Sequence, residues 1–80
     1  MSAHVWEETR RGKEWETRVL GMRITVHRYI DEDMWFATCH ELGGRMRLVS
    51  ETPEGARLEA LCRLRDRATA IADALKGASK

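Results

Sequence analysis

The sequence predicts a small α+β domain with two layers, in which an antiparallel sheet of three strands packs on one long C-terminal helix, a βββα order. Three observations lead to this prediction. Apolar and polar residues alternate with a period of two along residues 22–50. Apolar residues then recur every three or four positions along residues 53–76. Between the two patterns, Thr52-Pro53-Glu54 combines the residue types that begin helices.

Eighty residues are enough for one domain with a thin core. Residues 1–13 are mostly polar and have no clear period, so we expect a flexible N-terminal arm, anchored by Trp6. Residues 14–76 carry the periodic patterns and are expected to form the single α+β domain. Residues 77–80 are a short tail.

The first strands are predicted from alternation. Residues 14–20, EWETRVL, are a candidate fourth strand, and Gly21 predicts a bend, bulge or turn after it. Residues 22–30, MRITVHRYI, alternate clearly and are rich in strand formers. The residues expected to face the core are Met22, Ile24, Val26 and Ile30. The residues on the opposite face are Arg23, Thr25, His27 and Tyr29.

Two more strands complete the predicted sheet. A charged turn at residues 31–33 leads to a strand at residues 34–42. Gly43-Gly44 is a strong turn signal, and residues 45–50 resume the alternation. Short connections join antiparallel neighbours, so we expect the strands to form a meander.

The C-terminal helix is predicted at residues 53–76, and Gly77 ends it. Its apolar stripe comprises Leu58, Leu61, Leu64, Ala68, Ile71 and Leu75. We expect Leu61 and Leu64 to meet Ile24 and Val26 at the contact between helix and sheet.

Charge and composition narrow the classes of function. Fourteen Lys and Arg against thirteen Asp and Glu give a net charge of +1, which argues against strong long-range attraction to nucleic acid or anionic membranes. Eleven of the basic residues are Arg, which suits protein interfaces but also follows from a GC-rich genome. The sequence contains neither a signal peptide nor a membrane-spanning run, so we expect a cytoplasmic protein in which Cys39 and Cys62 are reduced.

The stretch WFATCHELGG at residues 35–44 raises the question of a metal or catalytic site. In a regular strand, Cys39 and His40 point to opposite faces and cannot bind one metal ion. His27 could approach Cys39 from a neighbouring strand, but a buried structural thiol is the favoured interpretation. No nucleotide-binding or paired-carboxylate motif occurs in the sequence. We therefore expect no metal, no cofactor and no enzymatic activity.

The exposed face of the sheet is the candidate binding site. Its residues are Arg23, His27 and Tyr29, with Arg45 and Arg47 on a neighbouring strand. Arg combined with Tyr is typical of protein interfaces. Arg combined with aromatic side chains can also stack on single-stranded RNA. A solvated face without any partner is the third interpretation.

Residues 35–67 resemble the core of the HicB-like antitoxins. The matching features are an aromatic-Ala strand, ELGG, a further strand, and ETPEGA at the start of a helix. That family has a Thr-x-Glu-Glu-Ala helix start, in which Gly55 here replaces the second Glu, and a turn of Pro-Gly type where this chain has Gly43-Gly44. The resemblance implies a partial RNase-H-like fold and an antitoxin that masks a toxin ribonuclease.

Residues 21–39, GMRITVHRYI followed by WFATC, are similar to small proteins of temperate phages that share a G-x-R-[IV]-T-V-H-R segment and then a Trp and a Cys. Phage accessory proteins of this size include anti-CRISPR proteins and other inhibitors that cover the working surface of a host protein. This resemblance implies an anti-CRISPR-type inhibitor of a host protein or ribonucleoprotein complex. Whether the chain is a monomer or a homodimer stays open from the sequence.

Overall fold

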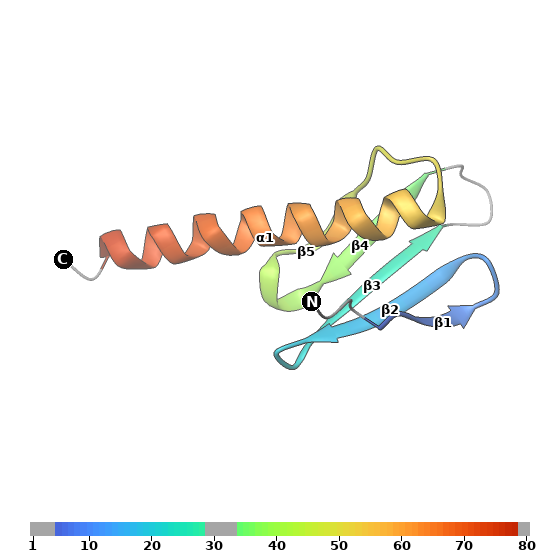
Figure 1. Cartoon of the computed structure of the whole chain (residues 1–80). Helices are drawn as coiled ribbons and strands as arrows, with labels where there is room; N and C mark the ends of the chain where they lie inside the picture. Colours follow the sequence, from blue (N-terminus) through green and yellow to red (C-terminus); the bar gives the residue numbers. More distant parts are fainter. Residues whose placement is uncertain (1–4, 29–33, 79–80) are drawn as a thin grey trace.

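The protein has two layers, a sheet and a helix (Figure 1). The computed structural model describes residues 5–28 and 34–78, and within them it contains a five-stranded antiparallel sheet in the order β1-β2-β3-β4-β5 and one long helix, α1. The strands are β1 (Glu7–Arg10), β2 (Glu14–Val19), β3 (Met22–Arg28), β4 (Trp35–Cys39) and β5 (Gly44–Arg47). A short 3-10 turn, η1 (His40–Leu42), follows β4, and α1 is Pro53–Ala78. The predicted α+β class and meander are confirmed.

The sheet is larger than predicted because β1 lies within the expected N-terminal arm. Residues 7–10 pair with β2. Val5 and Trp6, which precede them, also contact the rest of the domain. The Thr17 hydroxyl donates a hydrogen bond to the Val5 carbonyl at 2.8 Å, and Trp6 packs against the core. The prediction of a flexible arm is therefore wrong for residues 5–10. All four residues of β1 are exposed at the sheet edge, so their sequence carries no apolar period.

The candidate strand at residues 14–20 is confirmed as β2, which forms a hairpin with β3. Leu20 and Gly21 form the turn with positive φ angles of 51° and 83°. This conformation suits the twist of a two-residue hairpin, and Gly21 adopts it without strain. The Leu20 side chain is 97% exposed at the tip.

The predicted strands at 34–42 and 45–50 are each too long. β4 ends at Cys39, and η1 turns the chain so that Cys39 pairs with Gly44. Gly43 adopts a φ of 110°, and a Cβ atom there would lie 2.9 Å from the Arg67 guanidinium. Leu42 packs against the core from the turn instead of from a strand. The predicted ends Tyr29 and Ile30 and the turn at residues 31–33 lie outside the described residues.

The core lies between α1 and the central strands β3 and β4. Ala56 and Ala60 are fully buried in a cluster with Val26, Ala37 and Trp35. Because alanine side chains are small, the first turns of α1 can approach the sheet closely. The adjoining cluster contains Ile24, Cys39 and Leu64, with Leu61 packed beside it.

The predicted stripe on the helix is thus partly wrong. The predicted contact of Leu61 and Leu64 with Ile24 is confirmed, but Val26 lies in the cluster with the alanines. Leu58 is 68% exposed, because the buried face of α1 follows Ala56, Ala60 and Leu64 at intervals of four. In the sequence, Ala56 and Ala60 do not stand out as core residues, because leucines occupy neighbouring positions of the helix.

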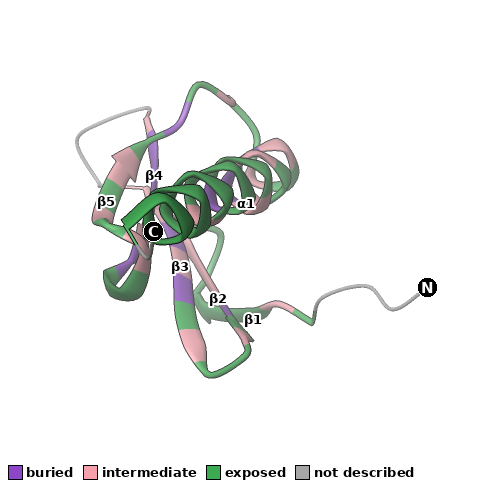
Figure 2. Cartoon of the chain, turned by 90° about the vertical axis from the view of Figure 1, so that its left-hand side faces the viewer, coloured by how far each residue is buried: buried purple, intermediate pink, exposed green. Residues whose placement is uncertain are grey.

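The helix is longer than the sheet beneath it. Its 26 residues extend about 39 Å, whereas the longest strand, with seven residues, extends about 23 Å. The C-terminal half of α1 therefore projects beyond the sheet, and its residues from Thr69 onward are exposed (Figures 1 and 2). Ile71 and Leu75 belong to the predicted stripe and lie on this projecting part.

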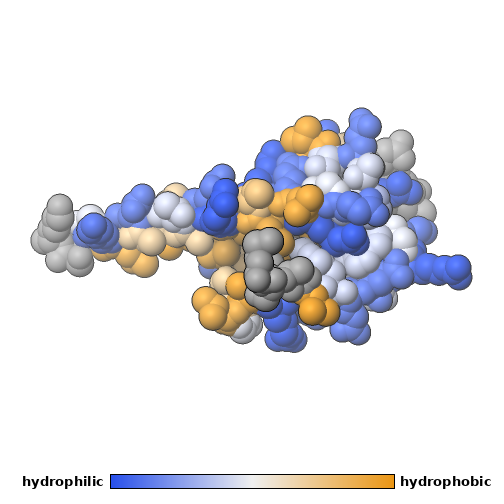
Figure 3. All heavy atoms as spheres, in the orientation of Figure 1, coloured by the Kyte–Doolittle hydropathy of each residue, from blue (hydrophilic) through white to orange (hydrophobic). Residues whose placement is uncertain are grey.

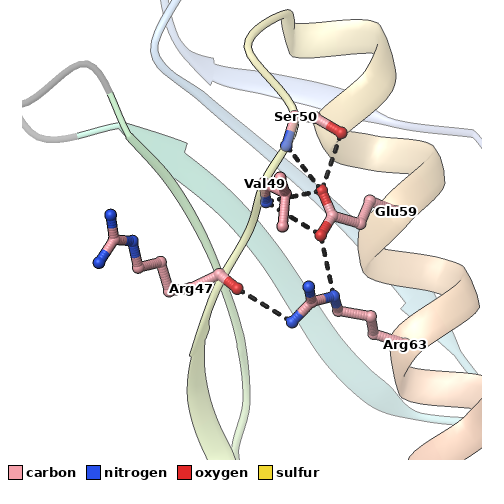
Figure 4. Close-up of polar contacts among 5 residues, drawn as sticks. All are labelled: Arg47, Val49, Ser50, Glu59 and Arg63. Atoms are coloured by element: carbon pink, nitrogen blue, oxygen red, sulfur yellow. Dashed lines mark hydrogen bonds and ion pairs between the residues drawn. The ribbon is translucent and has the colours of Figure 1, made fainter.

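The Glu59 side chain connects α1 by hydrogen bonds to the segment that follows β5 (Figure 4). Its carboxylate accepts hydrogen bonds from the Val49 and Ser50 amides, at 2.8–3.0 Å, and from the Ser50 hydroxyl at 2.8 Å. Arg63 lies 2.8 Å from the same carboxylate and donates a hydrogen bond to the Arg47 carbonyl at 3.2 Å. The Glu59–Arg63 pair, four residues apart on α1, thus also reaches the sheet.

Partial burial of the Glu59 carboxyl would by itself raise its pKa. The hydrogen bonds from Val49 and Ser50, together with the Arg63 guanidinium, outweigh this effect and lower the pKa below its ordinary value of 4.5. Because the folded-state pKa is depressed, the ionised carboxylate stabilises the fold above pH 4.5, and this stability is lost as the pH falls through the folded-state pKa.

Replacing Leu64 by Ala should lower the free energy of unfolding by about 2–4 kcal/mol, because the side chain is buried in the core. Replacing the exposed Leu58 should change it by about 0.5 kcal/mol or less. Urea denaturation at one protein concentration measures both. Equal losses would show that the helix is rotated relative to the structure described here.

Glu59→Gln should lower the free energy of unfolding at pH 7 by about 1–3 kcal/mol, because two backbone amides and Arg63 lose a charged partner. The difference from the parent should shrink below pH 4.5, where the parent also loses the charge. Thermal unfolding across pH 3–7 tests this, with exposed Glu51→Gln as the control. Parallel pH curves for the parent and the Glu59 variant would contradict the anchoring role.

Candidate functional site

The sheet face opposite α1 carries the predicted site residues that the structure describes. In the strand registers, Thr25 pairs with Thr38 and Thr38 with Arg45. His27 likewise pairs with Phe36, and Phe36 with Arg47. These residues point away from the helix, and we call this surface the outer face. Four of the five predicted site residues, Arg23, His27, Arg45 and Arg47, therefore lie on the outer face. The fifth, Tyr29, lies outside the described residues.

The outer face is not uniformly basic. The Arg23 guanidinium lies 2.6 Å from the Glu16 carboxylate across the β2–β3 pair, while its side chain stays 61% exposed. An exposed ion pair of this kind contributes little to stability. The pair restrains the Arg23 side chain beside Glu16 and still leaves most of its surface open to a partner.

Phe36 lies at the centre of the outer face between two charged or polar neighbours. The His27 ring stacks on Phe36, with ring centroids 5.9 Å apart and an angle of 22° between the planes. The Arg45 guanidinium lies 5.0 Å from the centroid of the same ring. Phe36 is therefore only 9% exposed, although it lies on the solvent side of the sheet. A cation–aromatic contact of this kind contributes about 0.5–1 kcal/mol.

Sequence reasoning did not select Phe36 as a site residue. The alternation of WFATC along β4 puts Phe36 on the same side as Thr38 and opposite Cys39, and the strand pairing agrees with this. What the alternation could not show was the register between strands, which brings His27 and Arg45 against its ring.

A shallow hollow of about 210 Å³ lies on the outer face along β3. Its lining residues are Glu14, Arg23, Thr25, His27, Thr38 and His40. The volume is below the range of about 300–1,000 Å³ typical of small-molecule sites. The mixed charges around the hollow suit polar contacts with a protein surface.

Burial lowers the pKa of His27 below its ordinary value of 6.5. Glu14 opposes this effect, whereas the guanidinium groups of Arg45 and Arg10 add to it. These effects favour the neutral form of the His27 ring, so positive charge on the outer face comes mainly from the arginines.

Cys39 and His27 lie on opposite faces of the sheet and cannot form a nucleophile pair. The Cys39 side chain is completely buried on the helix side. Burial also raises the pKa of its thiol, and the Glu41 carboxylate, 3.7 Å away, disfavours the thiolate further. Within residues 5–28 and 34–78, no three His, Cys, Asp or Glu side chains are grouped as metal ligands would be. Of the helical segments that the structure describes, none is long and apolar enough to cross a membrane.

Arg45→Ala should raise the pKa of His27, because it removes a nearby positive charge and lets water reach the ring. Titration of the His27 ring protons by NMR measures the shift. Arg18→Ala removes an arginine from the same face without touching Phe36, and it should leave the His27 pKa where it is. If Arg45→Ala lowers or does not change this pKa, the arrangement around Phe36 is wrong.

Comparison with protein families, with curated proteins and with solved structures found no match. The resemblances to the HicB-like core and to phage accessory proteins therefore stay predictions from short segments. The candidate site rests on the arrangement of side chains on the outer face.

Proposed function

We propose that the protein is a non-enzymatic binding module whose outer face covers the surface of another protein. The observation that carries this proposal is the set of arginines fixed on an open sheet. Arg23 is held by Glu16, and Arg45 by Phe36, so each loses less conformational freedom when a partner binds. Arginine is also among the residues that contribute most to the affinity of protein interfaces.

Two features favour a protein partner over RNA. Phe36 lies beneath His27 and Arg45 and is too buried to offer its ring to a base. Glu14 and Glu16 lie on the same face as the arginines and would repel a phosphate backbone. A protein surface can meet both signs of charge with complementary groups.

The specific form of the proposal is an accessory protein of a phage or mobile element that inhibits a host protein or ribonucleoprotein complex, as anti-CRISPR proteins do. It is supported by the similarity of residues 21–39 to temperate-phage proteins. An inhibitor of this kind needs only a surface that competes with a natural partner, and the outer face provides an area of mixed charge for this. The host cytoplasm is the compartment that this proposal requires.

A HicB-like antitoxin that masks a toxin ribonuclease is the second candidate. The order β4, β5, α1 agrees with the strand, strand and helix that this resemblance implies. In this case the outer face would cover a small basic enzyme instead of a large host complex.

The variant with Arg23→Glu and Arg47→Glu should lose partner binding while keeping the parent's melting temperature to within a few degrees, since both residues are exposed. The immobilised protein is incubated with host lysate, and retained proteins are identified by mass spectrometry. A control with Arg11→Glu and Lys13→Glu changes the net charge equally, at the exposed β1–β2 turn. It should retain the same partner as the parent.

The identity of the retained partner separates the candidates. A host complex supports the inhibitor, and a small ribonuclease supports the antitoxin. Retention of the same protein by the double Glu variant would show that binding uses another surface. Retention of RNA or DNA with an affinity that falls steeply with salt would replace the proposal by nucleic-acid binding.

A further inference from the structure

An apolar groove lies on the helix side of the sheet, away from the outer face. It has a volume of about 390 Å³ and opens between the end of the β2–β3 hairpin and the middle of α1. Val19 and Met22 line the side formed by the hairpin, and Leu61, Leu64 and Ala68 line the side formed by the helix. Most of the side chains that line it are apolar, so water in the groove gains few hydrogen bonds.

The projecting part of α1, residues 65–78, begins at the groove and continues its apolar surface beyond it. Ile71 is 36% exposed and Leu75 66% exposed, and both lie on the same stripe as Leu64 and Ala68. Leu20 is 97% exposed at the hairpin tip below. Figure 3 shows apolar atoms on the underside of the projecting helix and on the hairpin end, so that the two line one open corner.

The protein exposes more surface than a compact monomer of its size. Its accessible surface is 5996 Å², whereas a globular protein of 9.2 kDa has about 4,900 Å². Its radius of gyration is 13.6 Å, against about 11.6 Å for a compact domain of 80 residues. The excess area of about 1,100 Å² exceeds the roughly 800 Å² that each partner contributes to a standard interface.

We propose that a second copy of this chain occupies the groove and forms a symmetric dimer in which the two α1 helices pair antiparallel. Pairing centred between Thr69 and Ala70 places Leu75 of the second copy level with Leu64, at the groove. The same pairing places Ile71 of the second copy against Ala68. Two-fold symmetry repeats both contacts, so each projecting helix fills the groove of the other copy.

The lengths of the two parts favour this occupant. The projecting 14 residues extend about 21 Å, so that antiparallel pairing leaves the two sheets at opposite ends of the helix pair. The small side chains of Ala68 and Ala72 let the helix axes approach to about 8 Å. A single symmetric interface therefore covers the groove and the exposed stripe together, which a partner bound only in the groove would not do.

The dimer is independent of the proposed binding function. The groove and the projecting stripe lie on the helix side of the sheet, and the arginines of the outer face lie on the other side. Substitutions at Arg23 and Arg47 should therefore leave the dimer intact, so failure of one proposal does not decide the other.

Light scattering coupled to gel filtration tests the dimer on the full chain. The expected mass at micromolar concentrations is twice the 9.2 kDa of the chain. The variant with Ile71→Glu and Leu75→Glu should give the monomer mass, with its helical circular dichroism retained because both side chains are exposed in a single copy. A control with Ala70→Glu and Gly77→Glu adds the same charges away from the stripe and should stay dimeric.

The native thiol of Cys62 reports whether the groove is the interface, because it lines the groove and is exposed in a single copy. Alkylation of Cys62 should be several-fold slower in the parent and in the control than in the variant with Glu at 71 and 75. Buried Cys39 should react slowly in all three proteins. A monomeric parent, a dimer that persists in the stripe variant, or equal Cys62 rates in all three folded proteins would each overturn the proposal.

Discussion

The Glu59 carboxylate determines where the long helix rests on the short sheet. It binds the backbone directly after β5, and the alanines on the same part of α1 pack on β3 and β4. Because α1 is held at its N-terminal half and is longer than any strand, its excess length lies wholly at the C-terminal end. The exposed stripe and the open groove both follow because α1 is attached through its N-terminal half.

The sheet separates two surfaces of different chemistry. On the helix side, the thin core ends at the groove, where apolar side chains of the hairpin and of α1 are no longer covered by other parts of the protein. On the outer face, which α1 does not cover, side chains instead form local pairs such as Arg23 with Glu16 and Arg45 with Phe36. Binding to an apolar surface is favourable mainly because water is excluded from it, whereas charged groups make binding selective for a complementary partner. The two surfaces therefore suit different partners.

Alternation and helix periodicity were enough to predict the α+β class, the meander and the start of α1, because each pattern repeats over several residues. They could not predict β1, whose four side chains are all exposed, or η1, which depends on how Cys39 pairs with Gly44. Likewise, the period placed Phe36 on the outer face, but only the pairing of three strands brings His27 and Arg45 to it. The pattern along one strand predicts which face of the sheet a residue occupies. It does not predict which residues lie beside it on the neighbouring strands.

A dimer formed through the groove would change how the outer face binds. Each copy would keep its own outer face open, because the two surfaces lie on opposite sides of the sheet. Two identical sites joined by a rigid helix pair bind a repetitive or symmetric target with higher avidity than either site alone, provided that the target matches their spacing. Pairing through α1 would thus add affinity without enlarging the binding face, and the projecting helix would have a role that packing on its own sheet does not require.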